Sequence, residues 1–343
     1  MSLIASAISV VERAPLPDAL LRMGVHYLVG RTRERLNGAS PGAVEVFSRD
    51  MTRYPIAVHT SEANAQHYEV PARFFELTLG PRRKYSCCYY DAQVTTLAGA
   101  ELRALEETVA HAGLADGQDI LELGCGWGSL SLFMAEKYPK ARITAVSNST
   151  SQRRHIEAEA KRLGVDNLRV VTADMNDFTP SERFDRVVSV EMFEHMSNWR
   201  GLLTRLRDWL KADGRLFIHI FTHRDQAYRF DHADKSDWIA QHFFTGGIMP
   251  SHGLIRNFDD LFAVENEWRW SGLHYQRTAA DWLRNFDANR AEIDAVLRET
   301  YGTDAALWRK RWRLFFLATE GLFGDRNGEE WAVSHYRLRP VHG

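Results

Sequence analysis

The sequence predicts an α/β protein built around a parallel sheet, and two observations carry this prediction. Between residues 115 and 223, short apolar segments alternate with longer segments in which apolar residues recur at helical spacing. Strands and helices that alternate in this way form βαβ units, whose strands lie parallel. The first apolar segment also leads directly into "GCGWG", a glycine-rich turn of the kind that joins a strand to a helix beside a ligand.

The alternating part of the chain supplies five strands and three helices. The expected strands are 119–124, 142–149, 168–174, 184–190 and 215–223. The expected helices are 129–138, 151–164 and 199–214, and an irregular segment follows the fourth strand. Parallel strands bring their carboxyl ends to one edge of the sheet, so the residues just after each strand are the candidates for ligand binding.

The flanking parts of the chain are expected to cover this sheet. Residues 1–95 are expected to form an N-terminal helical cap that also covers the cofactor, with a helix over 16–36, and residues 96–343 the main domain. The 16–36 helix packs on the core or, alternatively, lies on a membrane surface. Residues 225–300 break the alternation and are expected to be an insertion over the acceptor pocket. The segment 322–338 reads as two strands around a polar turn.

Composition narrows the class of protein. The chain has 343 residues, 43 Lys and Arg against 45 Asp and Glu, and a formal net charge of -2, which argues against binding nucleic acid through bulk charge. Its three cysteines, Cys87, Cys88 and Cys125, suit a reducing compartment, so the expected location is the cytoplasm. The first residues lack the basic region of a secretory signal, and no apolar run is long enough for stable membrane insertion.

The glycine turn favours a cationic cofactor. Gly124, Gly126 and Gly128 are spaced G-x-G-x-G, whereas a dinucleotide site has G-x-G-x-x-G. Glu122 lies two residues before the first glycine, where its carboxylate would repel a pyrophosphate but not a cation. The pattern E-x-G-x-G-x-G after a first strand resembles the S-adenosylmethionine (SAM) loop of class I methyltransferases.

Further motifs resemble one family, the cyclopropane-fatty-acid-synthase-like methyltransferases, and within it the coclaurine N-methyltransferase branch. These motifs are "QHYEVPARFF" (66–75), "KYSCCYY" (84–90), Ser147-x-Ser149-x-x-Gln152, "EMFEHM" (191–196), "HYQRTAADWL" (274–283), "DWLRNFDANR" (281–290) and "NGEEWAVSH" (327–335). The resemblance implies the class I methyltransferase fold. This fold is Rossmann-like with a seven-stranded sheet, here with an N-terminal helical cap and a second helical cap inserted after the fifth strand.

The resemblance also implies a set of SAM-binding residues. Tyr85 and Ser86 would meet the carboxylate end of SAM, the three glycines the methionine and ribose, Gln152 the ribose, and Asp174 with Met175 the adenine. The full set of expected cofactor residues is Tyr85, Ser86, Glu122, Gly124, Gly126, Gly128, Asn148, Ser149, Gln152, Asp174, Met175 and Glu191.

Two methyl acceptors are compatible with the family. A cyclopropane synthase methylates an alkene and removes a proton with bicarbonate, held by a cysteine, a glutamate, a histidine, an isoleucine and a tyrosine. By motif these positions are Cys87, Glu194, His219, Phe221 and Leu283, of which only the first three match. An incomplete anion site counts against cyclopropanation, because buried polar groups need their partners.

An amine acceptor needs a base and a pocket that aims its lone pair at the methyl group. The resemblance assigns the base role to Glu194 and His195, and puts Glu191 near the sulfonium. Aromatic side chains suit a flat or cationic acceptor, although each could equally be a core residue. The expected acceptor residues are Tyr89, His219, Phe221, Phe244, His274, Tyr275 and Trp331, with Phe230, Trp238 and Phe243 as further candidates.

The sequence therefore predicts a SAM-dependent N-methyltransferase for a small cyclic or aromatic amine, benzylisoquinoline-like, with direct SN2 transfer and Glu194 with His195 as general base. One alternative is a fatty-acyl phospholipid C-methyltransferase or cyclopropane synthase, and another is a SAM-binding protein without catalysis. The spacing of His223, His232, His242 and His252 predicts no metal site. The expected partners are the amine and a second copy of the chain in a homodimer.

Overall fold

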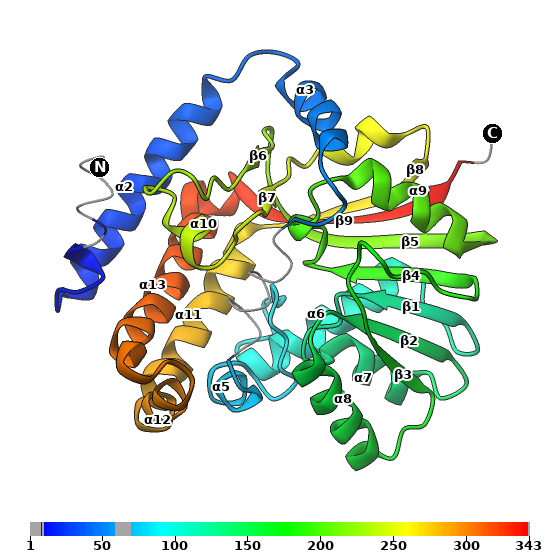
Figure 1. Ribbon diagram of the computed structural model, residues 1–343, viewed down its shortest axis with the longest axis horizontal. Helices are drawn as coiled ribbons and strands as arrows, with labels where there is room; N and C mark the ends of the chain where they lie inside the picture. The colour runs from blue at the N-terminus through cyan, green and yellow to red at the C-terminus, as the bar shows by residue number, and fades with distance from the viewer. Residues whose placement is uncertain (1–7, 9, 59–69, 342–343) are drawn as a thin grey trace.

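A seven-stranded sheet forms the centre of the protein (Figure 1). The computed structural model describes residues 8, 10–58 and 70–341. The strand order is β3-β2-β1-β4-β5-β9-β8; the first five run parallel, and β9 is antiparallel to both β5 and β8. The strands are β1 (Asp119–Leu123), β2 (Arg142–Ser147), β3 (Leu168–Thr172), β4 (Phe184–Val190), β5 (Leu210–His223), β8 (Phe262–Trp270) and β9 (Trp331–Pro340). The predicted α/β class and seven-stranded methyltransferase sheet are confirmed.

Helices cover both faces of the sheet. Successive strand residues point to opposite faces, and both sets are apolar. Ile120 of β1 packs into a cluster with α6 and α7, whereas its neighbour Leu121 packs into a cluster with α9. The helices of this half are α6 (Leu97–Ala112), α7 (Ser129–Lys137), α8 (Thr150–Leu163) and α9 (Trp199–Trp209), with the 3-10 turn η2 (Phe193–His195) after β4.

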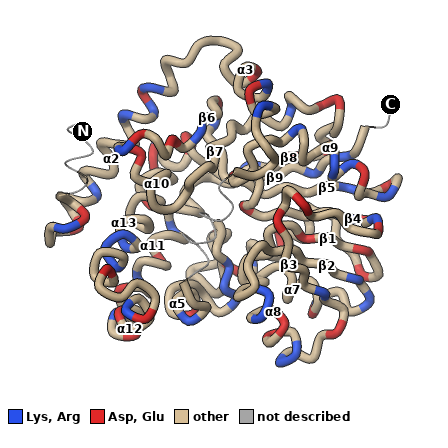
Figure 2. The backbone as a smooth tube through the Cα atoms, viewed as in Figure 1, with Lys and Arg blue, Asp and Glu red and all other residues tan. Residues whose placement is uncertain are grey.

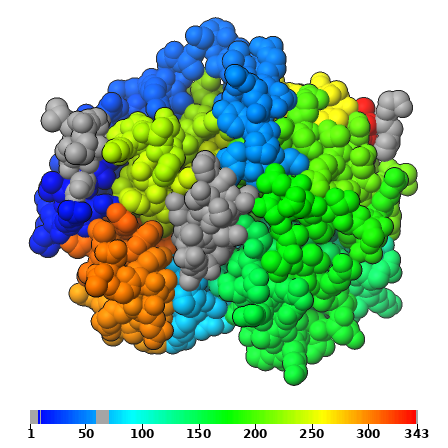
Figure 3. All heavy atoms as spheres, viewed as in Figure 1, coloured from blue at the N-terminus to red at the C-terminus, as the bar shows by residue number. Residues whose placement is uncertain are grey.

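A second group of helices lies beside the sheet at the left of Figure 1, where α11 and α13 contact β9. The helices α11, α12 and α13 pack on one another and on α2 and α5. Their bounds, with the remaining short elements, are α2 (Asp18–Asn37), α3 (Ala43–Asp50), η1 (Met51–Arg53), α5 (Ala72–Thr78), β6 (Tyr228–Arg229), α10 (Trp238–His242), β7 (Ile248–Met249), η3 (Leu254–Phe258), α11 (Gly272–Ala288), α12 (Arg290–Tyr301), η4 (Gly302–Asp304), α13 (Ala305–Gly324) and η5 (Asp325–Gly328). In the space-filling view this orange group and the green parallel-strand half lie on opposite sides of the face shown (Figure 3).

The N-terminal helix α2 matches the expected helix at 16–36 and is fixed to α13. Arg313 of α13 forms ion pairs with Asp18 at 2.6 Å and with Asp287 of α11 at 2.8 Å. At the crossing, a Cβ added to Gly321 would lie 2.4 Å from Val25 Cγ1, so the two helices touch where α13 has no side chain. Among the described residues, no helix combines the length and apolarity needed to cross a bilayer.

Charge is spread evenly over the molecule. Both signs are interspersed along the helical half and the parallel-strand half (Figure 2). This distribution agrees with the formal net charge of -2, and the described residues show no basic stripe in this view of the kind that tracks a nucleic-acid backbone.

Three predicted boundaries are wrong. The helix expected to run to 214 ends at Trp209, because Leu210 already pairs with Phe184 of β4. Residues 322–324, expected in a strand, form the last turn of α13, and only 331–340 form a strand. Strand β8 falls inside the expected insertion at 225–300, so the covering segments are two: 224–261 before β8 and the α11–α13 group after it.

Candidate active site

The glycine turn after β1 leaves room for a ligand at one of its three positions. All three glycines have positive φ, at 77° for Gly124, 51° for Gly126 and 83° for Gly128. A Cβ at Gly124 would lie 2.7 Å from the Met192 side chain, and one at Gly128 would lie 2.7 Å from Ile156, so the packing of the protein itself excludes them. A Cβ at Gly126 would meet nothing within 4 Å, because this residue faces an open cavity.

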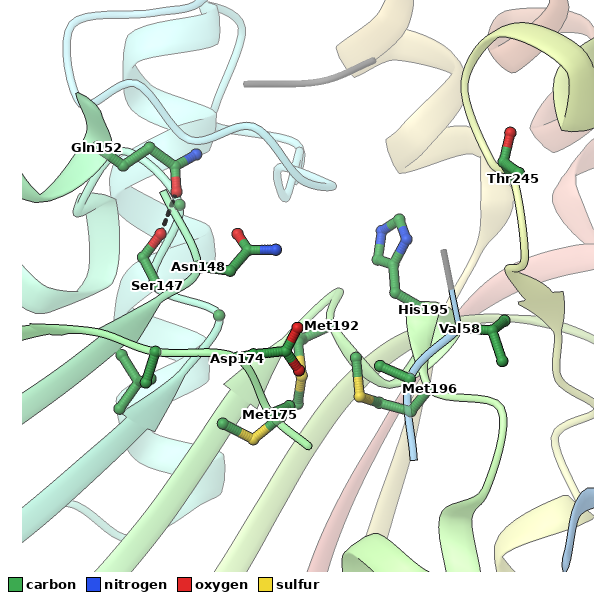
Figure 4. A pocket seen from close by; sticks show the side chains of 15 residues that line it. Val58, Ser147, Asn148, Gln152, Asp174, Met175, Met192, His195, Met196 and Thr245 are labelled. Carbon is green, nitrogen blue, oxygen red and sulfur yellow. Dashed lines mark hydrogen bonds between the residues drawn. The ribbon is translucent and has the colours of Figure 1, made fainter. Parts of the chain in front are cut away.

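The first cavity lies over the carboxyl ends of β1, β2 and β3 and has a volume of about 750 Å³, open to solvent. Asn148 and Asp174 point into it, and His195 faces them from the other side (Figure 4). Gln152 Oε1 accepts a hydrogen bond from Ser147 Oγ at 2.6 Å, which fixes the amide orientation. Met175, Met192, Met196 and Thr245 complete the wall.

A second cavity of about 600 Å³ adjoins the first at Gly124, Gly126 and Gln152. Its wall brings together distant parts of the chain: Lys84, Tyr85 and Ser86 before α6, Glu122 in β1, and Glu191 after β4. Of the twelve expected cofactor residues, the two cavities together contain all except Gly128, which packs against Ile156, and Ser149. Ser149 instead caps α8, accepting the Gln152 N–H, and so helps to position Gln152.

Glu191 is held rigidly in the wall of the second cavity. Its Oε1 accepts the Cys87 N–H at 2.9 Å, its Oε2 accepts the Tyr275 hydroxyl at 2.7 Å, and His219 Nε2 lies 3.3 Å from Oε1. Its backbone is left-handed at φ 48°, an uncommon conformation for glutamate that persists because the side chain is fixed by these contacts. Burial raises the pKa of this carboxyl, while the nearby Lys84 acts in the opposite direction.

Glu194 and His195, the expected base pair, occupy different environments. His195 lines the first cavity, and its ring stacks on Phe244 with centroids 5.0 Å apart and planes 9° apart. Glu194 is fully buried and lines neither cavity; its Oε1 accepts the Phe221 N–H at 2.8 Å. Among the described residues its Oε2 has no hydrogen-bond partner. Burial, followed by the charge of Glu191, raises the pKa of Glu194 well above its usual value.

The expected acceptor residues divide into groups. Phe221 and Phe230 pack on Phe244, with centroids 5.7 and 5.4 Å from it, and these three rings beside His195 are called the aromatic cluster below. His219 and Tyr275 contact Glu191. Tyr89 stacks on His274 at 4.3 Å, and Trp331 is buried beside His223. None of the ten expected acceptor residues is among those that line the two cavities. Trp238 and Phe243 pack against each other, also away from both cavities.

The sequence reasoning missed Lys84, which is 3% exposed. Its Nζ donates to Ser86 Oγ at 2.5 Å and to the Cys87 carbonyl at 2.7 Å, so a buried cation lies at the base of the second cavity. The lysine was visible at the start of "KYSCCYY", but its burial was not. Leu283 and Cys87 are core residues, and residues 66–69 of the "QHYEVPARFF" motif lie outside the described residues.

The two cavities fit a nucleoside that carries a cationic centre. Gln152 Nε2, Ser129 Oγ and Trp127 Nε1 line the second cavity and are buried with no hydrogen-bond partner in the part of the chain described. Buried donors without partners indicate a ligand that accepts from them. The carboxyl groups of Asp174 and Glu191 supply hydrogen-bond acceptors on either side of the glycine turn.

Comparison with known proteins agrees with this arrangement. Residues 57–329 match the mycolic acid cyclopropane synthetase family. Over 293 residues the chain is 37% identical to an (S)-coclaurine N-methyltransferase of Thalictrum flavum subsp. glaucum, covering 84% of this chain and 81% of the relative. It is 28% identical over 271 residues to the cyclopropane-fatty-acyl-phospholipid synthase of Escherichia coli K12, covering 78% of this chain and 66% of the relative.

One solved structure matches almost the whole chain. A coclaurine N-methyltransferase bound to N-methylheliamine and S-adenosylhomocysteine (SAH) has a TM-score of 0.93 and 32% identity, covering 98% of this chain and 100% of that one. The match therefore includes the helical group α11–α13 and the N-terminal α2 as well as the sheet.

Proposed function

The chain belongs to the mycolic acid cyclopropane synthetase family, and within it we propose an N-methyltransferase that acts on a small cyclic amine of the benzylisoquinoline kind. The enzyme class and the cofactor are established by the same relatives: the chain is a SAM-dependent methyltransferase. The acceptor, the residues that hold SAM and the residues that handle the proton are the proposal.

The observation that carries the proposal is the environment of Glu191. Cys87 and His219 are two of the positions expected to hold bicarbonate in a cyclopropane synthase. Here the Cys87 N–H and the Tyr275 hydroxyl donate to the Glu191 carboxyl, and His219 Nε2 lies within hydrogen-bond distance of it. A carboxyl of the chain thus takes the partners that a separate anion would need. This supports amine methylation over cyclopropanation, because a dissociable anion would compete with Glu191 for the same donors.

The proposed SAM site follows the two cavities. Asp174 and Met175 would hold the adenine, Asn148 and Gln152 the ribose, and Tyr85 with Ser86 the methionine end. When bound, SAM supplies a methyl group on a positively charged sulfur, which leaves as a neutral thioether when a nitrogen lone pair attacks the methyl carbon. Glu191 at the wall of the second cavity would attract this positive charge.

The proposed proton acceptor is His195, the member of the expected Glu194–His195 pair that reaches a cavity. His195 reaches the first cavity, and its stacking on Phe244 fixes the plane in which its nitrogens face the acceptor. As the N–methyl bond forms, the amine proton passes to His195. The aromatic cluster beside His195 would hold the amine, since ring faces attract a cation.

The first experiment is a screen for SAH release with cyclic amines and unsaturated phospholipids side by side. Tetrahydroisoquinolines should release SAH without added bicarbonate. His195→Ala should lower kcat/KM by roughly 10²–10⁴-fold and leave SAH affinity unchanged, because a base acts on the acceptor and not on the cofactor. His252→Ala is the matched control, since His252 bonds to Ser334 and lines neither cavity.

Release only with lipid, and only with bicarbonate, would overturn the proposal in favour of a fatty-acyl enzyme. Tight SAM binding without release from any acceptor would favour a non-catalytic SAM-binding protein. The homodimer and the cytoplasmic location stay predictions; light scattering after size-exclusion chromatography tests the first, and microscopy of the tagged chain tests the second.

A further inference from the structure

A chain of three histidines connects Glu191 to the protein surface. His219 Nε2 lies 3.3 Å from Glu191 Oε1, and His219 Nδ1 lies 2.7 Å from His335 Nε2. His335 Nδ1 lies 2.8 Å from His111 Nδ1, and His111 Nε2 lies 3.3 Å from a Glu107 oxygen. The three rings come from β5, β9 and α6, and His219 and His335 are direct cross-strand partners.

The chain crosses from a fully buried region to solvent. His219 and His335 are completely buried, whereas the His111 and Glu107 side chains are 12% and 21% exposed. His111 is held in place by stacking on Trp268, with centroids 3.9 Å apart and planes 8° apart. Each ring nitrogen of the three histidines therefore has a partner within the series from Glu191 to Glu107, and the contacts continue from the cavity wall to the surface.

These contacts couple the tautomers of the rings. A neutral imidazole donates from one nitrogen and accepts at the other, so with three neutral rings all N–H groups point the same way along the chain. In the outward arrangement, Glu191 is protonated and donates to His219, and His111 Nε2–H donates to the Glu107 carboxylate. In the inward arrangement, His219 Nε2–H donates to an ionised Glu191.

We propose that His219, His335 and His111 form a proton relay through which Glu191 exchanges its proton with solvent beside Glu107. When a sulfonium lies against Glu191, the relay changes to the inward arrangement. This change rests on SAM binding and not on the amine proposed above. Glu191 gives its proton to His219 Nε2, His219 Nδ1 gives one to His335 Nε2, and His335 Nδ1 gives one to His111 Nδ1. His111 Nε2 releases one to Glu107 or water. For each proton that Glu191 gives up, one proton leaves His111. After neutral SAH is released, the same transfers run in reverse and return a proton to Glu191.

The electrostatic environment suits this transfer. Burial lowers the pKa of His219 and His335 well below the usual value, so the inner rings pass a proton on and do not retain a charge. Burial and Arg337 lower the pKa of His111 to about 4, which favours release of the proton at the surface. The charged groups that face the two ends are Lys84 and Glu194 at Glu191, and Glu107 and Arg337 at His111.

Nuclear magnetic resonance of the full chain with isotope-labelled histidine tests the relay without any methyl acceptor. The nitrogen and carbon shifts of His111 report which ring nitrogen carries the proton. At neutral pH, His111 should be the Nε2–H tautomer with SAH and the Nδ1–H tautomer with SAM. His252 is the internal control, since it bonds to Ser334 of β9 outside the relay and should not change.

Two variants separate a relay from a direct effect of the cofactor charge. Glu191→Gln removes the carboxylate and His335→Phe removes the central ring, and each should abolish the tautomer difference at His111. The same His111 tautomer with SAM and SAH in the unmodified chain would overturn the relay. A difference that persists in Glu191→Gln would also overturn it. Because neither ligand requires an amine, failure of the amine screen leaves this test valid.

Discussion

The residues around the candidate site include carboxyl groups that the fold keeps out of water. Glu122 is buried beneath the glycine turn, where it accepts a hydrogen bond from Ser131 Oγ, and burial raises its pKa to about 8. Glu191 and Glu194 are shifted in the same direction. These carboxyl groups therefore ionise when a cation enters the site. This behaviour suits a sulfonium cofactor better than a neutral one.

Replacing Glu122 tests whether burial raises the pKa of this carboxyl group in the folded protein. The folded pKa is above the unfolded value of 4.5, so the folded state holds the proton longer and the native chain loses stability as pH rises from about 5 to 8. Glu122→Gln keeps the shape without the titration. Its free energy of unfolding relative to the native chain should rise with pH by at most about 1.4 kcal/mol per unit.

Urea unfolding at pH 5.5, 6.5 and 7.5 measures the effect, with Glu157→Gln on the exposed face of α8 as the control. A difference between Glu122→Gln and the native chain that is independent of pH would show that Glu122 is ionised in the folded state.

At the scale of elements, the contact of α2 with α13 depends on one missing side chain. Gly321→Ala should destabilise the protein by about 1–3 kcal/mol, although alanine favours helix, because its Cβ would collide with Val25. Gly24→Ala in α2 is the matched control: nothing lies within 4 Å of the added Cβ. It should stabilise by up to about 1 kcal/mol, as measured by urea unfolding. Equal effects of the two substitutions would contradict this packing.

The elements differ in how far their sequence predicts them. Strands β1, β2 and β4 are apolar on both faces and were predicted within a few residues. Strand β8 was missed because its exposed face carries charged residues such as Glu267, which obscure the apolar alternation. The last turn of α13 was misread because "LFG" before a polar turn looks like a strand end.

The candidate site was predictable where it follows the parallel strands, since the carboxyl ends of such strands must meet. Asp174, Glu191 and His195 follow β3 and β4, were given their roles by the family resemblance, and line the cavities. Tyr275 and His335 could not be related to Glu191, because α11 and β9 reach it only through tertiary packing. The separate environments of Glu194 and His195 were equally invisible, since adjacent residues can face the core and the cavity.

For the whole molecule, the buried titratable groups predict a stability maximum between about pH 6 and 7. Above this range the carboxyls of the unfolded state are already ionised, whereas the folded state still binds protons at its buried carboxyls, so stability falls as pH rises. Below about pH 6.5 the unfolded histidines take up protons that buried rings refuse, so stability falls as pH falls. The carboxyl groups with raised pKa are Glu101, Glu122, Glu191, Glu194 and Asp237.

The histidines with lowered pKa outnumber them: His111, His155, His219, His223, His242, His252, His274 and His335. Thermal unfolding from pH 4 to 9 in the absence of ligand measures the curve. A melting temperature that rises steadily across this range would contradict the prediction.

The position of β9 has a consequence for how the protein is made. Strand β9 lies between β5 and β8, although both precede it in the chain. On the ribosome, β5, which can already pair with β4, emerges with one open hydrogen-bonding edge, and β8 emerges unpaired; both wait for residues 331–340 to fill the gap between them. His335, the middle ring of the histidine chain, arrives on that same strand. A nascent chain halted before β9 would thus expose unpaired strand edges to which chaperones could bind. It would also lack the link between Glu191 and the surface.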